Sequence, residues 1–165
     1  MSMVMKEYPI IFSAPMIRAL LAGRKTVTRR LSRQWLKVKA GDRLWVREGF
    51  AVQPFLWKKN HELQPSHYLA DVPDFGQIED YIKKSSIHMP RWASRISLEA
   101  TEDARVERLK DITNEDAIRE GIACDEVVPW AAYAFLWDGL HAKPGERWED
   151  NPEVVRIAFT NRGIS

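Results

Sequence analysis

The chain has 165 residues, of which 45% are hydrophobic and 29% are charged, a composition typical of one folded globular domain. Its net charge of +2 is too small to predict nucleic-acid binding, and its single cysteine, Cys124, excludes an internal disulfide and a zinc site built on cysteines. Residues 1–10 contain no apolar core, and no apolar run approaches the roughly 20 residues that cross a bilayer, so we expect a cytoplasmic protein without a membrane anchor.

The first predicted elements are a short strand and a helix. Residues 8–12 form an apolar run that is typical of a strand. Ser13 is a suitable N-cap for the helix that follows, and Pro15 fits its first turn because the N–H group that proline lacks needs no partner there. Gly23 predicts the end of the helix, whose expected buried face consists of Met16, Ile17, Leu20 and Leu21.

A basic cluster follows the predicted helix end. Residues 23–30 read Gly-Arg-Lys-Thr-Val-Thr-Arg-Arg, which places one lysine and three arginines close together. The helix dipole favours cations at a helix C-terminus, but it accounts only for Arg24 and Lys25. Like charges this close repel unless solvent or an anionic partner compensates them. The basic character continues to Lys39 without an acidic residue, whereas residues 99–126 are rich in Asp and Glu, so we expect a surface that is polarised in charge.

A second strand is predicted over residues 43–48, directly after the turn-forming pair Gly41-Asp42. Alternation places two aliphatic side chains on one face of this strand and an aromatic and a cationic one on the other, namely Leu44 and Val46 against Trp45 and Arg47.

Residues 51–90 are interrupted by four prolines and contain only one strand-like stretch, at residues 68–70. We interpret them as a long irregular connection inserted into the domain. Its aromatic residues predict that much of it packs on the core, and these are Phe55, Trp57, Tyr68, Phe75 and Tyr81.

The C-terminal half contains further strands and two helices. Residues 94–109 have the pattern of extended β structure, and Thr113 opens a capping-box helix that Gly121 closes. A helix is predicted over residues 127–140, and a final strand over residues 154–159 precedes a polar tail. Strands interrupted by helices, without regular alternation, predict an α+β fold whose mixed or antiparallel sheet curls into a barrel with helices on its flank.

Lys25 and Thr28 have the residue types of a nucleophile and its base. A threonine hydroxyl is a weak nucleophile until a base removes its proton. A lysine can be that base where burial or adjacent cations lower its pKa, and Arg24, Arg29 and Arg30 supply such cations. A carboxylate is also needed to orient the lysine, and composition leaves many candidates for it.

The remaining chemical groups give weaker predictions. The four histidines have no spacing suited to a shared metal, and neither phosphate-binding glycine loops nor a GxSxG motif occur, so we expect no metal and no cofactor. Trp45 and Trp92 lie near arginines and could stack a base or pack in the core. His88 lies in a basic and aromatic segment at residues 86–92, where a structural hydrogen bond is the plainer interpretation.

Four motifs in this order resemble the ASCH (activating signal cointegrator homology) domain family, and they are residues 9–12, 21–29, 41–42 and 116–122. Residues 44–48 and 86–92 further resemble a phage-associated and prophage branch of that family. The resemblance covers nearly the whole chain and implies a single domain over residues 1–165, with the irregular insertion at about 51–90. It implies a PUA-like β-barrel flanked by helices, with a cleft between barrel and helices.

One branch of this family, the YqfB-like enzymes, consists of amidohydrolases that deacetylate N(4)-acetylcytidine. Their lysine, threonine and glutamate fall on Lys25, Thr28 and Glu120, which the resemblance makes the catalytic set. The chain departs from these enzymes in its greater length, in the 51–90 insertion and in reading Thr28-Arg29-Arg30 where they have an apolar residue before arginine. The predicted substrate-binding residues are Arg24, Thr26, Arg29, Arg30, Trp45, Arg47, His88, Arg91 and Trp92.

Two hypotheses of function remain open at this stage. In the first, the protein hydrolyses the amide of an N(4)-acylated cytidine-type substrate through Lys25, Thr28 and Glu120. In the second, it is an RNA-binding module or a weak single-stranded RNA nuclease, whose basic stretch contacts phosphates while aromatic side chains stack bases. Both expect a nucleoside or single-stranded RNA as partner. Glu120 precedes Gly121 at a predicted helix end, where a solvated glutamate is the default, so its catalytic role requires proximity to Lys25.

Overall fold

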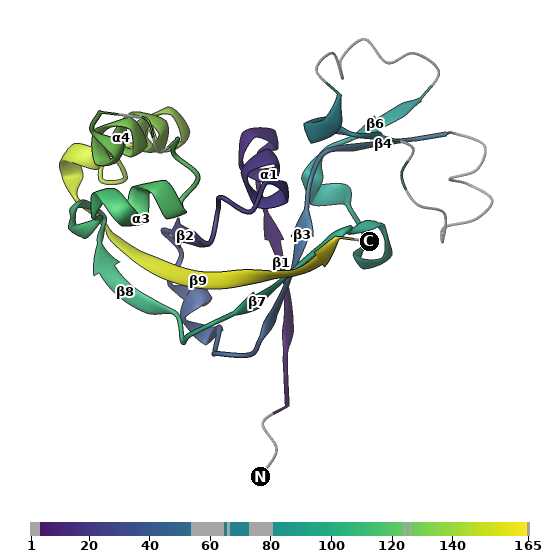
Figure 1. Cartoon of the computed structure of the whole chain (residues 1–165), viewed down its shortest axis with the longest axis horizontal. Coiled ribbons are helices and arrows are strands. Elements are labelled where there is room, and N and C mark those ends of the chain that lie inside the picture. Colours follow the sequence, from purple (N-terminus) through teal and green to yellow (C-terminus); the bar gives the residue numbers. More distant parts are fainter. Residues whose placement is uncertain are drawn as a thin grey trace.

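The structure is a computed structural model that describes residues 4–53, 65, 67–72, 81–123, 125 and 127–164 (Figure 1). It has a mixed α+β architecture with one large curled sheet and few helices, a β-barrel-like fold with flanking helices. The strands of the large sheet run in the order β1-β3-β7-β9-β2, with β8 also paired to β9. Their bounds are β1 Glu7–Ile11, β2 Val27–Arg30, β3 Arg43–Arg47, β7 Ile96–Ala100, β8 Arg105–Arg108 and β9 Glu153–Ile164.

The long strand β9 produces the curl of the sheet. Residues 159–164 of β9 pair antiparallel with β7, whereas residues 155–158 pair with β2 and residues 153–156 with β8. Figure 1 shows β9 as one curved yellow strand that crosses the molecule. The parallel pair β1–β3 completes the sheet.

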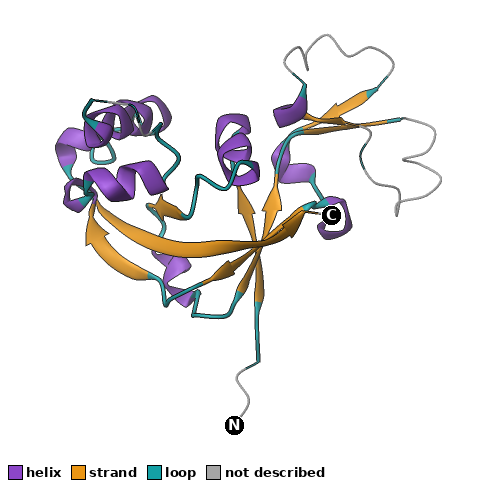
Figure 2. Cartoon of the chain, in the orientation of Figure 1, coloured by secondary structure: helices purple, strands orange, loops and turns teal. Residues whose placement is uncertain are grey.

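In the part of the chain that the structure describes, the α-helices that flank the sheet are α1 (Ala14–Leu21), α3 (Asn114–Arg119) and α4 (Pro129–Leu140). Figure 2 shows α3 and α4 together near the β8 end of β9, and α1 above β1. Short 3₁₀ helices lie at Arg33–Lys37, Leu69–Asp71, Ser86–His88, Arg91–Ala93, Leu109–Asp111 and Trp148–Asp150. No helix in the described part of the chain is long and apolar enough to cross a membrane.

The local patterns produce the expected elements. In β3, Leu44 and Val46 are fully buried while Trp45 and Arg47 are half-buried, which confirms the predicted alternation. Helix α1 begins after Ser13, although the Ser13 side chain makes no capping hydrogen bond.

Helix α3 is capped as predicted, because the Thr113 hydroxyl accepts a hydrogen bond from the Asp116 N–H at 3.0 Å. Gly121 ends this helix at φ +114°, and a Cβ there would lie 3.1 Å from Cβ of Ala19 and 3.8 Å from Cβ of Lys25. Only glycine combines this backbone with so close an approach, so Gly121 lets the end of α3 pack against α1 and the basic cluster.

Two expectations differ from the structure. The predicted polar tail is part of β9, which continues to Ile164 because its polar residues pair with β7. A second sheet of three short strands, β5-β4-β6, lies mostly in the stretch predicted to be irregular, and its bounds are β4 Phe50–Val52, β5 His67–Tyr68 and β6 Ile82–Lys84. Of the strand-like residues 68–70, only Tyr68 belongs to a strand, because Leu69–Asp71 form a 3₁₀ helix.

The small sheet carries its own core of Phe50, Val52, Met89 and Ala93. Of the aromatic residues expected to pack here, Tyr68 lies against this core, and Tyr81 meets the ring of His67 edge-on. Phe55, Trp57 and Phe75 lie outside the described residues.

Candidate active site

Two cations of the basic cluster, Lys25 and Arg29, are neutralised by the acidic segment of the same chain. Arg29 forms ion pairs with Glu107, Asp116 and Glu120, and Lys25 forms one with Glu120. These acids all lie within residues 99–126, which were expected to form an acidic surface of their own. The expectation of a polarised surface is therefore wrong for these residues, because the two segments meet and compensate each other.

Lys25 lies between α1 and β2 with a side chain that is only 2% exposed. Its ammonium group donates hydrogen bonds to the carbonyl oxygen of Val27 at 2.9 Å, the carbonyl oxygen of Glu120 at 2.8 Å and Oε2 of Glu120 at 2.9 Å. Burial lowers the pKa of Lys25, the Glu120 carboxylate opposes this effect, and the nearby guanidinium groups of Arg30 and Arg29 add to it.

Glu120 is buried and bridges two cations. Its Oε2 accepts a hydrogen bond from Nζ of Lys25, and its Oε1 accepts one from Nη1 of Arg29 at 3.0 Å. The position of Glu120 is fixed by the backbone around it, since the Thr26 N–H donates to the Arg119 carbonyl at 2.8 Å, directly beside Glu120. Glu120 is therefore held against Lys25, and is not the solvated helix-end glutamate that its sequence context favours.

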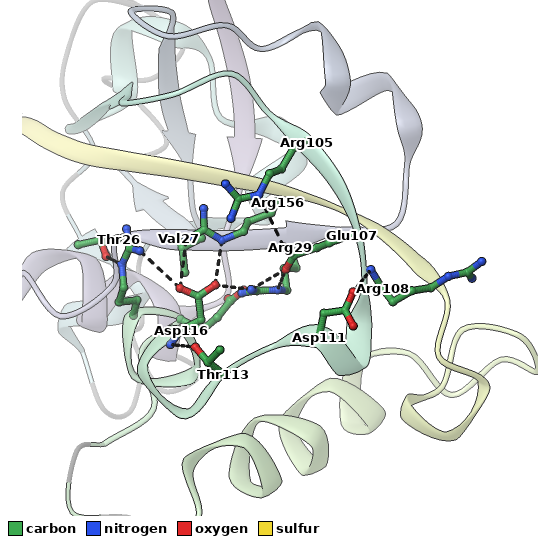
Figure 3. Close-up of polar contacts among 12 residues, drawn as sticks. Thr26, Val27, Arg29, Arg105, Glu107, Arg108, Asp111, Thr113, Asp116 and Arg156 are labelled. Carbon is green, nitrogen blue, oxygen red and sulfur yellow. Dashed lines mark hydrogen bonds and ion pairs between the residues drawn. The ribbon is translucent and has the colours of Figure 1, made fainter.

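A second carboxylate, Asp116, binds two arginines, Arg29 and Arg156 (Figure 3). It accepts hydrogen bonds from Arg29 and from Nε and Nη2 of Arg156, at 2.8 and 3.0 Å for Arg156. Although burial raises the pKa of Asp116, the hydrogen bonds from Arg156 and Arg29 hold it well below its ordinary value overall. Each nitrogen of the Arg29 guanidinium thus donates to a carboxylate, so Arg29 links three acidic side chains and has a structural role in the site.

Thr28, on β2, is buried, and its hydroxyl oxygen accepts a hydrogen bond from Nε of Arg30 at 3.3 Å. Arg30 also donates to the carbonyl oxygen of Ile11 at 2.7 Å and lies over the ring of Phe12, 4.8 Å from its centroid. Lys25 forms no hydrogen bond with Thr28, because its three N–H groups all have other acceptors.

Tyr133 brings a further polar group to the site from helix α4. It is 4% exposed, and burial together with the neighbouring Glu120 carboxylate raises the pKa of its hydroxyl well above the ordinary value. The tyrosine is therefore neutral at physiological pH and able to donate a hydrogen bond.

These groups line one cavity of about 220 Å³ between the sheet, α1 and α4. Lys25, Thr28, Arg29, Arg30 and Glu120 form its polar side. Its apolar and aromatic side consists of Phe12, Met16, Tyr133, Leu136, Trp137, Leu140 and His141. The sequence predicts the helix over residues 127–140, but it does not indicate that Tyr133 and Trp137 of this helix border the basic cluster.

The other predicted substrate-binding residues lie elsewhere. Arg24 is exposed and donates to the carbonyl oxygen of Gly121 at 2.9 Å, and the Thr26 hydroxyl accepts a hydrogen bond from Arg119. Neither is among the residues that line the cavity, and the same holds for Trp45, Arg47, His88, Arg91 and Trp92.

Trp45 and Arg47 belong to β3, and the other residues named last lie in residues 88–92. Arg47 donates to the carbonyl oxygens of Met89 and Ile87 and, like Arg91, lies over the Trp45 ring. His88 is exposed, and Trp92 packs against the core of the small sheet. Among the residues that the structure describes, no group of three or more His, Cys, Asp or Glu side chains could hold a metal ion.

The comparisons with known proteins give a likeness of fold. No family model matches the chain, and no curated protein matches its sequence. Among solved structures, the chain is similar to the crystal structure of protein EF3133 from Enterococcus faecalis V583, described by the family-model name DUF984. The two share 12% identity and a TM-score of 0.49 over 99% of this chain and 84% of the other. The likeness concerns the fold alone, and membership of the ASCH family stays a prediction.

Proposed function

We propose that the chain is an ASCH-type domain with a PUA-like barrel, and that it hydrolyses the amide bond of an N(4)-acylated cytidine or a similar modified nucleoside. The observation that carries the proposal is the buried pair of Lys25 and Glu120, whose charged atoms lie 2.9 Å apart in a cavity that Thr28 also lines. These residues come from segments about 95 positions apart in the sequence, and they are the three that the family resemblance selects.

The cavity suits a small ligand with an aromatic ring. Its volume of about 220 Å³ lies below the roughly 300–1,000 Å³ of pockets for drug-sized ligands, which favours a nucleobase or nucleoside over a longer segment. Phe12, Tyr133 and Trp137 give it aromatic walls, against which a base can pack. The polar groups of Lys25, Thr28 and Glu120 line the same cavity, where an acyl group on the base would meet them.

Thr28 is the proposed nucleophile. Its Oγ1 bonds to the acyl carbon while its proton passes to the neutral amine of Lys25, and a tetrahedral intermediate forms. The C–N bond then breaks, and the Lys25 ammonium returns the proton, through Glu120, to the exocyclic nitrogen that leaves. Water hydrolyses the acyl-threonine ester in a second step, which releases the carboxylic acid and restores the hydroxyl group of Thr28.

Lys25 must lose a proton and turn toward Thr28 before this step, because its three N–H groups are donated elsewhere. Burial already lowers its pKa, which reduces the cost of the neutral amine at physiological pH. Hydrogen bonds between nucleophile and base often form only in the complex with substrate. Arg30, which donates to the Thr28 oxygen, would stabilise negative charge as it develops there.

Incubation of the purified protein with N(4)-acetylcytidine, followed by chromatography for cytidine and acetate, tests the proposal. We expect Thr28→Val and Lys25→Met to reduce turnover at least a hundredfold. Thr26→Val is the matched control, because the Thr26 hydroxyl contacts Arg119 and not the cavity. Turnover that survives in Thr28→Val, or that fails equally in Thr26→Val, would overturn the assigned roles.

The RNA-binding alternative has weaker support from the site. It relies on free cations in the basic cluster, whereas Arg29 and Lys25 are buried and paired with carboxylates of the same chain. Incubation with single-stranded RNA separates the two hypotheses, because a nuclease shortens the chain and an amidohydrolase leaves its length unchanged.

A further inference from the structure

A second cavity, of about 250 Å³, lies where β3, β7 and the C-terminal end of β9 meet. None of its lining residues also lines the candidate active site. Its polar lining consists of four arginines and two serines, Arg43, Arg91, Arg95, Arg162, Ser94 and Ser97. No carboxylate is among the described residues that line it, so the groups facing a ligand are cations and hydroxyls.

Three of the four arginines have carboxylate partners. Arg95 is fully engaged by Glu48 and Asp71 and is only 10% exposed. The other two arginines form ion pairs at the surface, Arg91 with Glu7 at 3.3 Å and Arg162 with Glu99 at 2.9 Å. About half of each of these two arginine side chains reaches solvent, so both can turn toward a ligand at little cost.

Arg43 differs from the other three. Within the described part of the chain its side chain forms no ion pair and no hydrogen bond, and its Nε–H group is buried without an acceptor. A buried donor without a partner is costly, so such a group in a folded protein calls for an explanation. An oxyanion bound against this guanidinium would supply an acceptor that the described residues do not provide.

The strand register explains why Arg43 stays unpaired. Glu7 in β1 and Glu99 in β7 lie directly opposite Arg43, one on each side. Their carboxylates, however, form ion pairs with Arg91 and Arg162. The two acids nearest in register are thus held by the two arginines that share the cavity with Arg43.

Trp45 lies beside the cavity but does not line it. It is two residues after Arg43 on the same face of β3, and the guanidinium group of Arg91 lies 5.8 Å from its ring centroid. The described part of the lining holds arginines and serines and no aromatic side chain, which favours recognition of an anion over stacking of a base.

We propose that this cavity binds the phosphate group of a phosphorylated ligand, with Arg43 as its central contact and Arg91 and Arg162 as flanking contacts. Guanidinium groups bind phosphate through paired N–H donors, and the serine hydroxyls can add neutral donors. The phosphate can belong to a mononucleotide or to a polynucleotide backbone, since both present the same oxyanion. The site does not depend on the amidohydrolase proposal, because the two cavities share no residue.

Calorimetric titration of the full chain with inorganic phosphate, a 5′-mononucleotide and a single-stranded oligoribonucleotide tests the site. We expect Arg43→Gln to weaken binding at least tenfold, and Arg162→Gln, an exposed position with little risk to folding, to weaken it severalfold. Arg33→Gln is the matched control, because Arg33 is 66% exposed in a surface ion pair and does not line the cavity. Its affinity should stay within twofold of the unsubstituted protein.

The three ligands identify the source of the phosphate. Equal dependence of the mononucleotide and the oligonucleotide on Arg43 indicates recognition of a single phosphate group, and dependence of the oligonucleotide alone indicates a polynucleotide backbone. The proposal is overturned if none of the three binds, if Arg43→Gln and Arg162→Gln bind as the unsubstituted protein does, or if Arg33→Gln loses as much affinity as Arg43→Gln.

Discussion

Glu120→Gln should destabilise the protein more than a surface substitution of the same kind. The carboxylate lies 2.9 Å from Nζ of Lys25 and 3.0 Å from Nη1 of Arg29, and all three side chains are at most 5% exposed. Glutamine has the same shape but only one acceptor oxygen. Its amide group would place N–H donors against a buried cation that also has only donors.

The expected loss follows from the partners that remain. Removing one partner of a buried ion pair costs about 3–5 kcal/mol. Arg29 keeps Asp116 and Glu107, so the loss falls mainly on Lys25, which has no other carboxylate partner among the described residues. Because burial already lowers the pKa of Lys25, the lysine can become neutral and avoid part of the penalty. We therefore expect a decrease of about 3 kcal/mol in the free energy of unfolding at pH 7, near the lower end of that range.

Urea unfolding followed by tryptophan fluorescence measures this loss, provided that the dependence of the free energy on urea is unchanged between variants. Glu153→Gln is the matched control, because Glu153 is 48% exposed and pairs with Arg33 and Arg108 at the surface. It should cost less than about 1 kcal/mol. A loss in Glu120→Gln no larger than in Glu153→Gln would refute the reasoning, since it would mean that Lys25 does not depend on this carboxylate.

Three further predictions follow from other residues of the site. Hydrogen bonds from Arg156 and Arg29 outweigh burial and hold the pKa of Asp116 low. The ionised carboxylate therefore stabilises the fold above about pH 4, and this stabilisation is lost as the pH falls through the folded-state pKa. Asp116→Asn should flatten that part of the acid-unfolding curve. Lys25 has a lowered pKa in the folded state, so the unfolded chain binds more protons and stability should rise with pH between that pKa and about 10.5. Urea midpoints measured from pH 7 to 9.5 should therefore rise in the unsubstituted protein, and this rise should be absent in Lys25→Met. Gly121→Ala should destabilise the protein by about 1–3 kcal/mol because of the positive φ and the 3.1 Å approach to Ala19. Gly139→Ala, which has open space in helix α4, should stabilise it by roughly 0.5–1 kcal/mol, and thermal melts of both variants measure the difference.

The elements that the sequence predicts correctly depend on neighbouring residues. The alternation of β3 and the Thr113 cap of α3 are encoded within five or six positions, so a single sequence is enough to find them. The small sheet β5-β4-β6 has strands of only two or three residues, in which no alternation can be recognised. Its pairing is non-local, because β4 meets β5 and β6 across long connections.

The charge pattern of the site shows why composition misleads. The basic cluster and the acidic segment look like two separate surfaces in the sequence. In the fold, β2 pairs with β9 and α3 packs against the end of α1, which brings Lys25 and Arg29 to Glu120 across more than 90 positions. The family resemblance selected Glu120, but no local pattern indicated that Asp116 and Glu107 would hold Arg29. Tyr133 was missed for the same reason, because a predicted helix over residues 127–140 does not reveal which segment its side chains meet.

Glu120 and Lys25 connect the stability of the fold to the proposed chemistry. Glu120 compensates the two buried cations, and it is also the group that would relay a proton from Lys25. A loss of activity in Glu120→Gln therefore cannot separate catalysis from folding. Thr28 can separate them, because its hydroxyl forms a single hydrogen bond of 3.3 Å with Arg30 and bears no charge. Thr28→Val should lower stability by only about 1 kcal/mol while it reduces turnover at least a hundredfold, so Thr28 is the residue on which the proposed mechanism is best tested.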